Sequence, residues 1–326
     1  MSLSDKTRVV LVDRAAYNGF RPKQRPSEIT NTRRIAMLTT VIGSYPLRYT
    51  ELGSDAIRQS VDDQVRAGVD LVSDGQTRYD MIEYFAKAIE GYVFEGDKSR
   101  VTGKIGRGDP TEFVADFRIA KSLHPHVKGI ITGPVTLVFS SLIRGGGYKG
   151  YRDLSVYLDT AAGLRDIAMA LVAEGAEWIQ IDEPFLSVGA PMDIARDAVE
   201  HLARDLNVPV AMHVCGTVKD IFAQILQWSG ITLLSHAFKG DRNDEVLQSD
   251  ELKRSNKMLG LGCIDTKSPI VDSKDDVVAL LRRGIAEIST KRIVVHPDCG
   301  MRMLPRDAAF EKMKIMVAAA REVNGS

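Results

Sequence analysis

The sequence predicts an α/β fold, a (β/α)8 TIM barrel with a short N-terminal extension, from three observations. From residue 37 onward there are eight short apolar runs, each followed by a polar or glycine-rich turn and a plausible amphipathic helix, as in a barrel. The length of 326 residues suits one barrel with an extension. The sequence lacks the G-x-G-x-x-G turn that an open doubly wound sheet is expected to show after an early strand.

The predicted elements follow one another along the chain, with residues 1–36 as the extension and residues 37–326 as the catalytic barrel. Strands are expected at residues 38–42, 69–73, 129–132, 178–181, 208–212, 231–234, 258–263 and 292–295. Helices are expected at residues 54–67, 154–174, 194–206, 218–228, 276–287 and 306–323, among others. The strands are assigned from apolar runs and the helices from amphipathic periodicity.

The composition is that of a globular protein with a large core, since 44% of residues are hydrophobic and 26% are charged. With 43 basic and 43 acidic side chains, nothing indicates a nucleic acid or an anionic membrane as a partner. No apolar run approaches the ~18 residues of a membrane span. Three cysteines form a sparse, odd set, which predicts a reducing compartment. We therefore expect a cytoplasmic protein, and the sequence allows a homo-oligomer.

Two segments place metal-binding residue types just after predicted strands. His213 and Cys215 follow the run 208–212 with one residue between them, so both side chains project from one face. They form half of a zinc site, although a buried cysteine beside a satisfied histidine has the same pattern. Cys299 has a matching setting, and a barrel would bring it to the same C-terminal mouth. Cys263 lies inside an apolar run and is assigned to the core.

Two further features have open interpretations. Asp182 and Glu183 are adjacent at a strand end, so their side chains diverge and only one easily faces a pocket. The glycine-rich segment Arg144-Gly145-Gly146-Gly147-Tyr148-Lys149-Gly150 lacks the Gly-Lys-Ser/Thr ending of a phosphate-binding loop. A lid or a plain loop is therefore the better interpretation.

Five separated motifs occur in order along the chain. They are Thr40-Val41-Ile42-Gly43-Ser44-Tyr45-Pro46, Gly133-Pro134-Val135-Thr136, Ile179-Gln180-Ile181-Asp182-Glu183-Pro184, His213-Val214-Cys215 and Pro297-Asp298-Cys299-Gly300. Together they make the chain, from residue 37 to its end, resemble the C-terminal catalytic barrel of the cobalamin-independent methionine synthase family. Long members carry a second, N-terminal barrel that helps to bind a folate donor, and this sequence has no such half. The resemblance therefore implies the short, single-barrel type, associated with methylcobalamin or a methylated corrinoid protein as donor.

The resemblance also assigns roles to particular residues. The implied Zn²⁺ ligands are His213, Cys215 and Cys299. Asp182 would bind the amino group of homocysteine. The implied amino-acid pocket contains Ile42, Gly43 and Ser44, together with Met81, which matches a methionine that packs against the substrate.

The chain departs from the family pattern at two positions. Where the family supplies a glutamate as a further zinc ligand, this chain has Ala237, directly after His236. If Ala237 faces the metal, His236 should point the other way, and water or the substrate thiol would take the fourth position. Where long members have a histidine that acts as proton donor, this chain has Lys267. Lys267 would then be the proton donor, or the reaction would use none at this position.

These features predict a zinc-dependent methyltransferase that converts homocysteine to methionine, with methylcobalamin or a methylated corrinoid protein as donor. A donor of this kind needs no protonation of the leaving group, whereas the N5 atom of a folate does. Two alternatives stay open, an alkyltransferase acting on another thiol such as coenzyme M and a non-catalytic zinc- or thiol-binding relative. A thiol that carries a sulfonate would need arginines such as Arg78 to bind the sulfonate.

Overall fold

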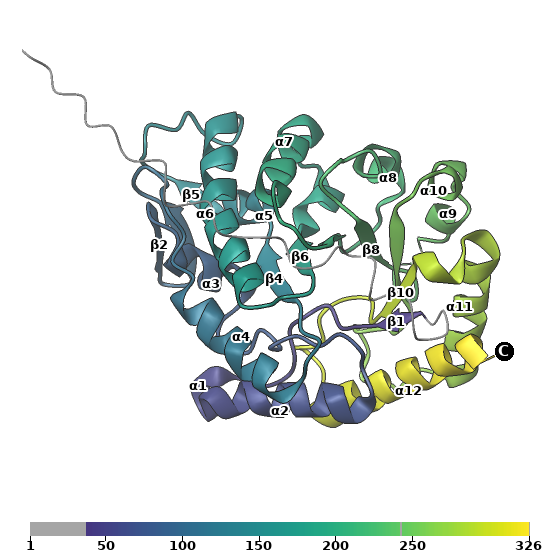
Figure 1. Cartoon of the computed structure of the whole chain (residues 1–326). Helices are drawn as coiled ribbons and strands as arrows, with labels where there is room; N and C mark the ends of the chain where they lie inside the picture. The colour runs from purple at the N-terminus through teal and green to yellow at the C-terminus, as the bar shows by residue number, and fades with distance from the viewer. Residues whose placement is uncertain (1–36, 242, 326) are drawn as a thin grey trace, which may run out of the picture. The chain divides into compact units, whose positions relative to one another are not determined.

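The structure is a computed structural model that describes residues 37–241 and 243–325. The extension expected over residues 1–36 lies outside the described residues. In the described part, a curled parallel sheet is surrounded by helices (Figure 1). The alternating apolar runs and amphipathic segments therefore predicted the α/β class correctly.

The main sheet has seven strands across residues 37–241 and 243–325, in the order β1-β10-β9-β8-β7-β6-β4. Every neighbouring pair is parallel. The strands are β1 (Leu38–Thr39), β4 (Gly129–Thr132), β6 (Ile179–Asp182), β7 (Val210–His213), β8 (Leu233–Ala237), β9 (Met258–Gly262) and β10 (Ile293–His296). Each overlaps a run that was predicted as a strand. Because all of them are parallel, their carboxyl ends share one edge of the sheet.

Helices connect successive strands and cover the outside of the sheet (Figure 1). The longer ones are α2 (Ser54–Ala67), α3 (Met81–Ala88), α4 (Thr111–Leu123), α6 (Leu154–Ala173), α7 (Met192–Ala203), α11 (Lys274–Glu287) and α12 (Arg306–Gly325). The shorter ones are α1 (Tyr49–Leu52), α5 (Pro134–Phe139), α8 (Lys219–Ile225), α9 (Asp244–Leu247), α10 (Asp250–Arg254) and the 3-10 helices η2 (Pro184–Val188) and η3 (Thr290–Arg292). The last helix, α12, packs against α11 and α2, so the two ends of the described chain lie side by side.

The run at residues 69–73 differs from the prediction of eight full strands. It forms one parallel bridge on each side, from Leu71 to Thr40 and from Val72 to Val127. Here side chains form hydrogen bonds with backbone groups that would otherwise pair with a neighbouring strand. The Asp70 carboxylate accepts from the backbone N–H of Thr39 at 2.9 Å, and the side chain of Gln64 on α2 bonds both backbone groups of Ser73. The sheet is thus a curled seven-stranded one of TIM-barrel type, without a continuous eighth strand in the described residues.

The interior of the sheet is built in layers because alternate residues of each strand face inward. At the amino ends of the strands the inward side chains form an apolar cluster of Leu38, Trp178, Ala211, Leu233, Met258 and Val294. Two residues further along, the same strands present Thr40, Gln180, His213, Ser235, Gly260 and His296. Two residues beyond that come Ile42, Asp182, Cys215, Ala237, Gly262 and Asp298. The interior therefore changes from apolar to polar toward the carboxyl edge.

A second, three-stranded sheet in the described part was not predicted. It consists of β2 (Tyr92–Glu95), β3 (Lys98–Val101) and β5 (Ser141–Ile143). β2 and β3 form an antiparallel hairpin, and β5 pairs with β3 in parallel. The glycine-rich loop follows β5 and is held by Tyr148, whose hydroxyl bonds the backbone N–H of Ile105 and the Asp159 carboxylate.

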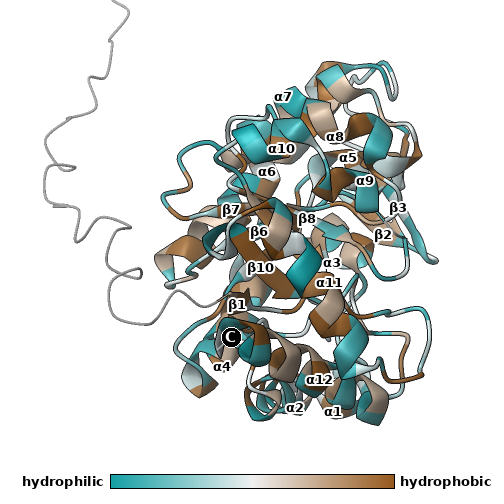
Figure 2. Ribbon diagram, turned by 90° about the vertical axis from the view of Figure 1, so that its right-hand side faces the viewer, coloured by the Kyte–Doolittle hydropathy of each residue, from teal (hydrophilic) through white to brown (hydrophobic). Residues whose placement is uncertain are grey.

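Hydropathy is distributed as expected for this architecture. In Figure 2 the strands labelled β6 and β10 are largely hydrophobic, whereas the surrounding helices carry hydrophilic residues as well. None of the helices in the described ranges is long and apolar enough to cross a membrane.

Candidate metal centre

The structure brings together the three residues predicted as metal ligands. His213 ends β7, Cys215 follows it, and Cys299 lies just beyond β10. Their potential ligand atoms all lie within 4.8 Å of one another. The His213 Nε2 atom is 3.0 Å from the Cys215 sulfur, which is 3.0 Å from the Cys299 sulfur. Gly216, at φ 81°, turns the chain away directly after Cys215.

The donor set suits zinc. One imidazole nitrogen and two thiols are ligands that Zn²⁺ prefers, and three protein ligands are what a catalytic zinc uses. The hydrogen bond between the two sulfurs favours a thiolate at Cys299. The hydrogen bond from Cys215 lowers the pKa of Cys299, against the opposing effect of burial. The same contact with Cys299 raises the pKa of Cys215. Since the thiolate is the metal ligand, the residues present fit the ion.

Cys263 is fully buried and lies outside this group of three. Burial raises the pKa of its thiol well above the ordinary value. Its assignment to the core is confirmed.

Asp182 and Glu183 diverge as predicted. Asp182 points into the interior, where its carboxylate accepts from the side chain of Gln180 at 2.6 Å. Burial raises the pKa of Asp182 to about 6, and His213 is the strongest opposing influence. Glu183 points to the helix layer, where it accepts from the backbone N–H groups of Val135 and Thr136 at 2.9 and 2.8 Å. Asp182 therefore faces the thiols, and Glu183 caps the start of α5.

The residues expected to line an amino-acid pocket lie around the same carboxyl edge. The carbonyl of Ile42 accepts from Gln180 at 2.8 Å, which connects it to Asp182. A Cβ atom on Gly300 would lie 2.1 Å from the Ser44 hydroxyl oxygen, so Ser44 is next to the residue after Cys299. The remaining two, Gly43 and Met81, contact other residues. A Cβ on Gly43 would lie 2.7 Å from the Gln76 amide oxygen, and the carbonyl of Met81 accepts from Thr132 at the end of β4.

Lys267 lies at the solvent side of the mouth. Its side chain is 69% exposed, and its ammonium pairs with Asp241 at 2.5 Å. The hydrogen bond to Asp241 raises the pKa of Lys267, which makes it a weaker proton donor. A role for Lys267 as the catalytic acid stays a prediction.

His236 points away from the thiols, as strand alternation predicted. Its ring is fully buried, stands edge-on to Phe222 of α8 at 5.8 Å between centroids, and lies 3.2 Å from the carbonyl of Val214. Burial lowers its pKa to about 3. Ala237, the next residue on β8, therefore faces inward, at the position where the family pattern has a glutamate.

The polar layer below the thiols was not predicted from the sequence. Lys128 is buried, and its ammonium contacts the carbonyl of Val41 and, at 2.5 Å, the amide oxygen of Gln180. Burial lowers the pKa of Lys128 to about 7, while the charge of Asp182 opposes this. On the neighbouring strands, Ser235 contacts His296 and His213. The period of two points to Gln180, Ser235 and His296, which stand two positions before Asp182, Ala237 and Asp298. It does not point to Lys128, which reaches this layer through its long side chain.

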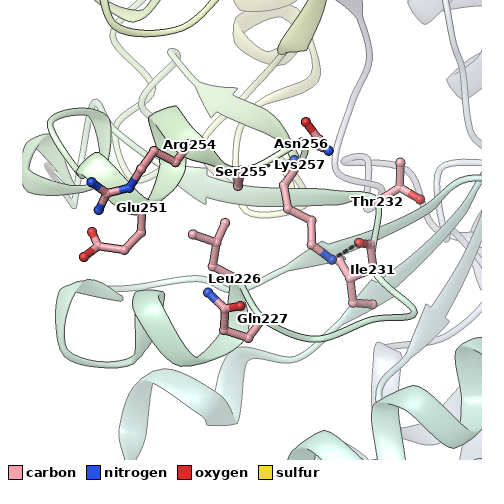
Figure 3. A pocket seen from close by; sticks show the side chains of 9 residues that line it. All are labelled: Leu226, Gln227, Ile231, Thr232, Glu251, Arg254, Ser255, Asn256 and Lys257. Carbon is pink, nitrogen blue, oxygen red and sulfur yellow. Dashed lines mark hydrogen bonds between the residues drawn. The ribbon is translucent and has the colours of Figure 1, made fainter.

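The pocket drawn in Figure 3 is elsewhere. Its lining comes from the segment after α8 and from the region of α10 and the start of β9, and Lys257 points into a turn where its ammonium contacts the carbonyl of Ile231 (Figure 3). It therefore lies near the amino ends of β8 and β9, at the opposite end of the sheet from the thiols. It brings together no predicted site residue.

A curled parallel sheet with an imidazole, two thiols and a buried carboxylate at its carboxyl edge defines an α/β enzyme with a candidate metal centre. The family described as cobalamin-independent synthase, catalytic domain, has a sequence model that matches residues 47–322. The chain belongs to this family and is a methyltransferase.

Individual relatives agree with this assignment. A methionine synthase of Methanothermobacter thermautotrophicus is 39% identical over 310 residues, covering 87% of this chain and 99% of that protein. A methionine synthase of Methanocaldococcus jannaschii is 36% identical over 315 residues, covering 87% and 99%. The structure of a B12-independent methionine synthase from a Shewanella species, in complex with selenomethionine, has a TM-score of 0.78 at 22% identity and covers 89% of this chain and 98% of that one. That structural likeness shows a shared fold.

Proposed function

We propose that the chain is a zinc-dependent methyltransferase that moves a methyl group to the thiol of homocysteine and so forms methionine. The catalytic unit is a (β/α)8 barrel over residues 37–326, closed through the segment 69–73. The observation that carries the proposal is the convergence of His213, Cys215 and Cys299 within 4.8 Å, beside the inward-facing Asp182. The relatives named methionine synthase support it.

In this proposal His213, Cys215 and Cys299 would hold Zn²⁺. The ion supplies a positive charge that keeps a substrate thiol deprotonated at neutral pH. The two cysteine sulfurs would limit that positive charge, so a substrate thiolate would keep its nucleophilicity toward a methyl group. A reducing, cytoplasmic environment keeps both cysteines available as ligands.

Asp182 orients the amino acid. Asp182 is 6% exposed, and its carboxylate interacts electrostatically with both His213 and Cys299. An ammonium group bound there would gain a charge-assisted hydrogen bond in a site of low dielectric constant. Ile42, Gly43 and Ser44 line the remainder of the amino-acid pocket, with Met81 at its margin. Binding at Asp182 would thus place the homocysteine thiol toward the two cysteines.

The proposed methyl donor is methylcobalamin or a methylated corrinoid protein. Release of a folate N5 atom requires a proton, whereas cob(I)alamin leaves without one. The acid histidine of the family pattern is replaced by Lys267, which is paired with Asp241. Among the described residues, the other histidines near this edge, His236 and His296, are fully buried within the fold. In the part of the chain that the structure describes, no exposed histidine at this edge takes the place of that acid.

The alternative of a sulfonate thiol such as coenzyme M is less well supported. Arg78, the candidate partner for a sulfonate, makes two hydrogen bonds to Asp116, at 2.8 and 2.5 Å, and stacks over Tyr49 at 3.9 Å. Its charge is already compensated. Asp182, by contrast, suits an amino acid.

A turnover assay tests the proposal. The zinc-loaded protein is incubated with homocysteine and either methylcobalamin or methyltetrahydrofolate, and methionine is measured. We expect methionine with methylcobalamin and little with the folate. Efficient turnover with the folate would refute the donor assignment, whereas methylation of coenzyme M but not of homocysteine would refute the substrate assignment. No turnover with any acceptor would favour a non-catalytic zinc- or thiol-binding protein.

A further inference from the structure

Ser235 and His296 form a hydrogen-bonded chain with His213 across the interior of the sheet. The Ser235 hydroxyl oxygen lies 2.9 Å from His213 Nδ1 and 2.9 Å from His296 Nε2. The other ring nitrogen of His296, Nδ1, lies 2.7 Å from the carbonyl oxygen of Pro297. His213, Ser235 and His296 are each at most 2% exposed, so water does not compete for these contacts.

The carbonyl of Pro297, at the end of this series of hydrogen bonds, determines which group donates in each of them. The carbonyl of Pro297 has no proton to give, so His296 donates to it from Nδ1. His296 is buried and meets no carboxylate among the residues that the structure describes, so a charged ring there would be an uncompensated buried charge. An uncharged ring that is protonated on Nδ1 has a lone pair on Nε2. His296 therefore accepts from Ser235.

Ser235 has a single hydroxyl proton, which it donates in the hydrogen bond to His296. The oxygen of Ser235 must then accept from His213, so the proton of the His213 ring lies on Nδ1. The remaining nitrogen, Nε2, keeps its lone pair and lies 3.0 Å from the Cys215 sulfur. This is the nitrogen that belongs to the cluster of potential ligand atoms.

A glycine makes the chain possible. Gly260 on β9 stands opposite Ser235 in the register, between β8 and β10. A Cβ atom at Gly260 would lie 2.6 Å from His296 Nε2 and 2.9 Å from the Ser235 Cβ. Only a residue without a side chain leaves space for the His296 ring to reach across β9. The absence of a side chain at Gly260 therefore allows the hydrogen bond between Ser235 and His296.

We propose that Ser235 and His296 are positioning residues that hold His213 in the tautomer with Nδ1 protonated and Nε2 free to bind zinc. The inference rests on the proposed function, because it takes His213 as a zinc ligand. Partners of this kind fix the orientation and basicity of metal-binding histidines, and their loss typically lowers metal affinity about 10- to 100-fold. Neither residue contacts the substrate in this assignment.

The test measures the zinc dissociation constant by competition with a chromophoric chelator. Ser235→Ala and His296→Leu should each weaken zinc binding about 10- to 100-fold. His296→Gln should restore most of the affinity, because the amide oxygen accepts from Ser235 and the amide N–H donates to Pro297. The matched control is His236→Leu, which removes an equally buried imidazole from the other face of β8 and should leave the affinity unchanged. Equal affinities for Ser235→Ala and the wild type would overturn the proposal.

A second measurement reads the tautomer directly. In a ¹⁵N–¹H spectrum of histidine-labelled protein, the ring proton of His213 should be on Nδ1, with or without zinc, and Ser235→Ala should lose that preference. A proton on Nε2 of neutral His213 would reverse the chain and overturn the proposal. Because the spectrum of the zinc-free protein in mildly alkaline solution reports the tautomer by itself, a wild type that binds no zinc would refute the proposed metal site without deciding this question.

Discussion

The two ends of the parallel sheet use polar groups in opposite ways. At the amino ends of β8 and β9, the ammonium of Lys257 contacts the carbonyls of Trp228 and Ile231, and the guanidinium of Arg292 donates to the carbonyls of Lys257 and Leu252. Each donor there has a protein acceptor. At the carboxyl ends, an imidazole nitrogen and two sulfurs face one another, with few protons among them.

The difference separates stabilising from functional polar groups. A cation that bonds backbone carbonyls completes the hydrogen bonding of the fold and has little left for a ligand. Converging lone pairs repel one another unless protons or a metal ion lie between them, so the thiol site is suited to a cation. The pocket in Figure 3 lies at the amino end of the sheet, where the cationic side chains already have carbonyl acceptors. The chemistry of the donors, more than the size of a cavity, therefore locates the site.

The largest expected effect comes from removing a ligand at the carboxyl end. Cys299→Ser should abolish stoichiometric zinc binding and lower turnover by more than the roughly 100-fold that is typical for an outer residue. Zinc content measured by atomic emission, together with methionine formation, checks this. Cys263→Ser is the matched control, because it removes a buried thiol outside the group of three. Zinc loss in Cys263→Ser but not in Cys299→Ser would show that the ligand assignment is wrong.

The next effect compares two adjacent carboxylates on either side of β6. Asp182→Asn removes the anion that would bind the substrate ammonium, and losing a charged hydrogen bond of about 1.5–3 kcal/mol should raise the KM for homocysteine about 10- to 100-fold. Glu183→Gln should leave that KM near the wild-type value, because Glu183 bonds Val135 and Thr136 on the helix side. Equal changes of KM in both variants would contradict the division of roles.

Much of this arrangement could be predicted from sequence, where local pattern and tertiary environment agree. The run at residues 129–132 and the helix at 54–67 match β4 (Gly129–Thr132) and α2 (Ser54–Ala67). The run at 69–73 was overestimated, because Asp70 and Gln64 bond backbone groups that a ladder would use. The small sheet was missed because the polar segment 98–101 has no strand pattern and pairs with a segment far along the chain.

For the site, residue type and strand position were enough to identify His213, Cys215 and Cys299 as a group. The roles of Ser235 and His296 could not be predicted, because their contact depends on the space above Gly260. That space follows from the register of β8, β9 and β10, which is a tertiary property.

An effect of similar size concerns stability at the helix side of β6. Burial raises the pKa of Glu183 from 4.5 to about 7 in the folded protein. The contribution of Glu183 to the free energy of unfolding is therefore fully present below its unfolded pKa and is lost as the pH rises through the folded value. Glu183→Gln should flatten the loss of stability between about pH 5 and pH 8, by up to about 3 kcal/mol. Urea unfolding across this range measures it, with the exposed Glu95→Gln as control. An unchanged slope in Glu183→Gln would contradict the prediction.

The smallest effect is expected at the amino end of the sheet, from Lys257→Met. The variant leaves the carbonyls of Trp228 and Ile231 without their ammonium partner, which should lower the free energy of unfolding by about 1–2 kcal/mol. Zinc affinity and the KM for homocysteine should not change, because the apolar layer of Leu233 and Met258 separates this end from the polar layers. Urea unfolding and the turnover assay check the two halves of the prediction. If Lys257→Met lowered zinc affinity while keeping its stability, the amino end would have to be coupled to the thiol site, and the contrast between the two ends would fail.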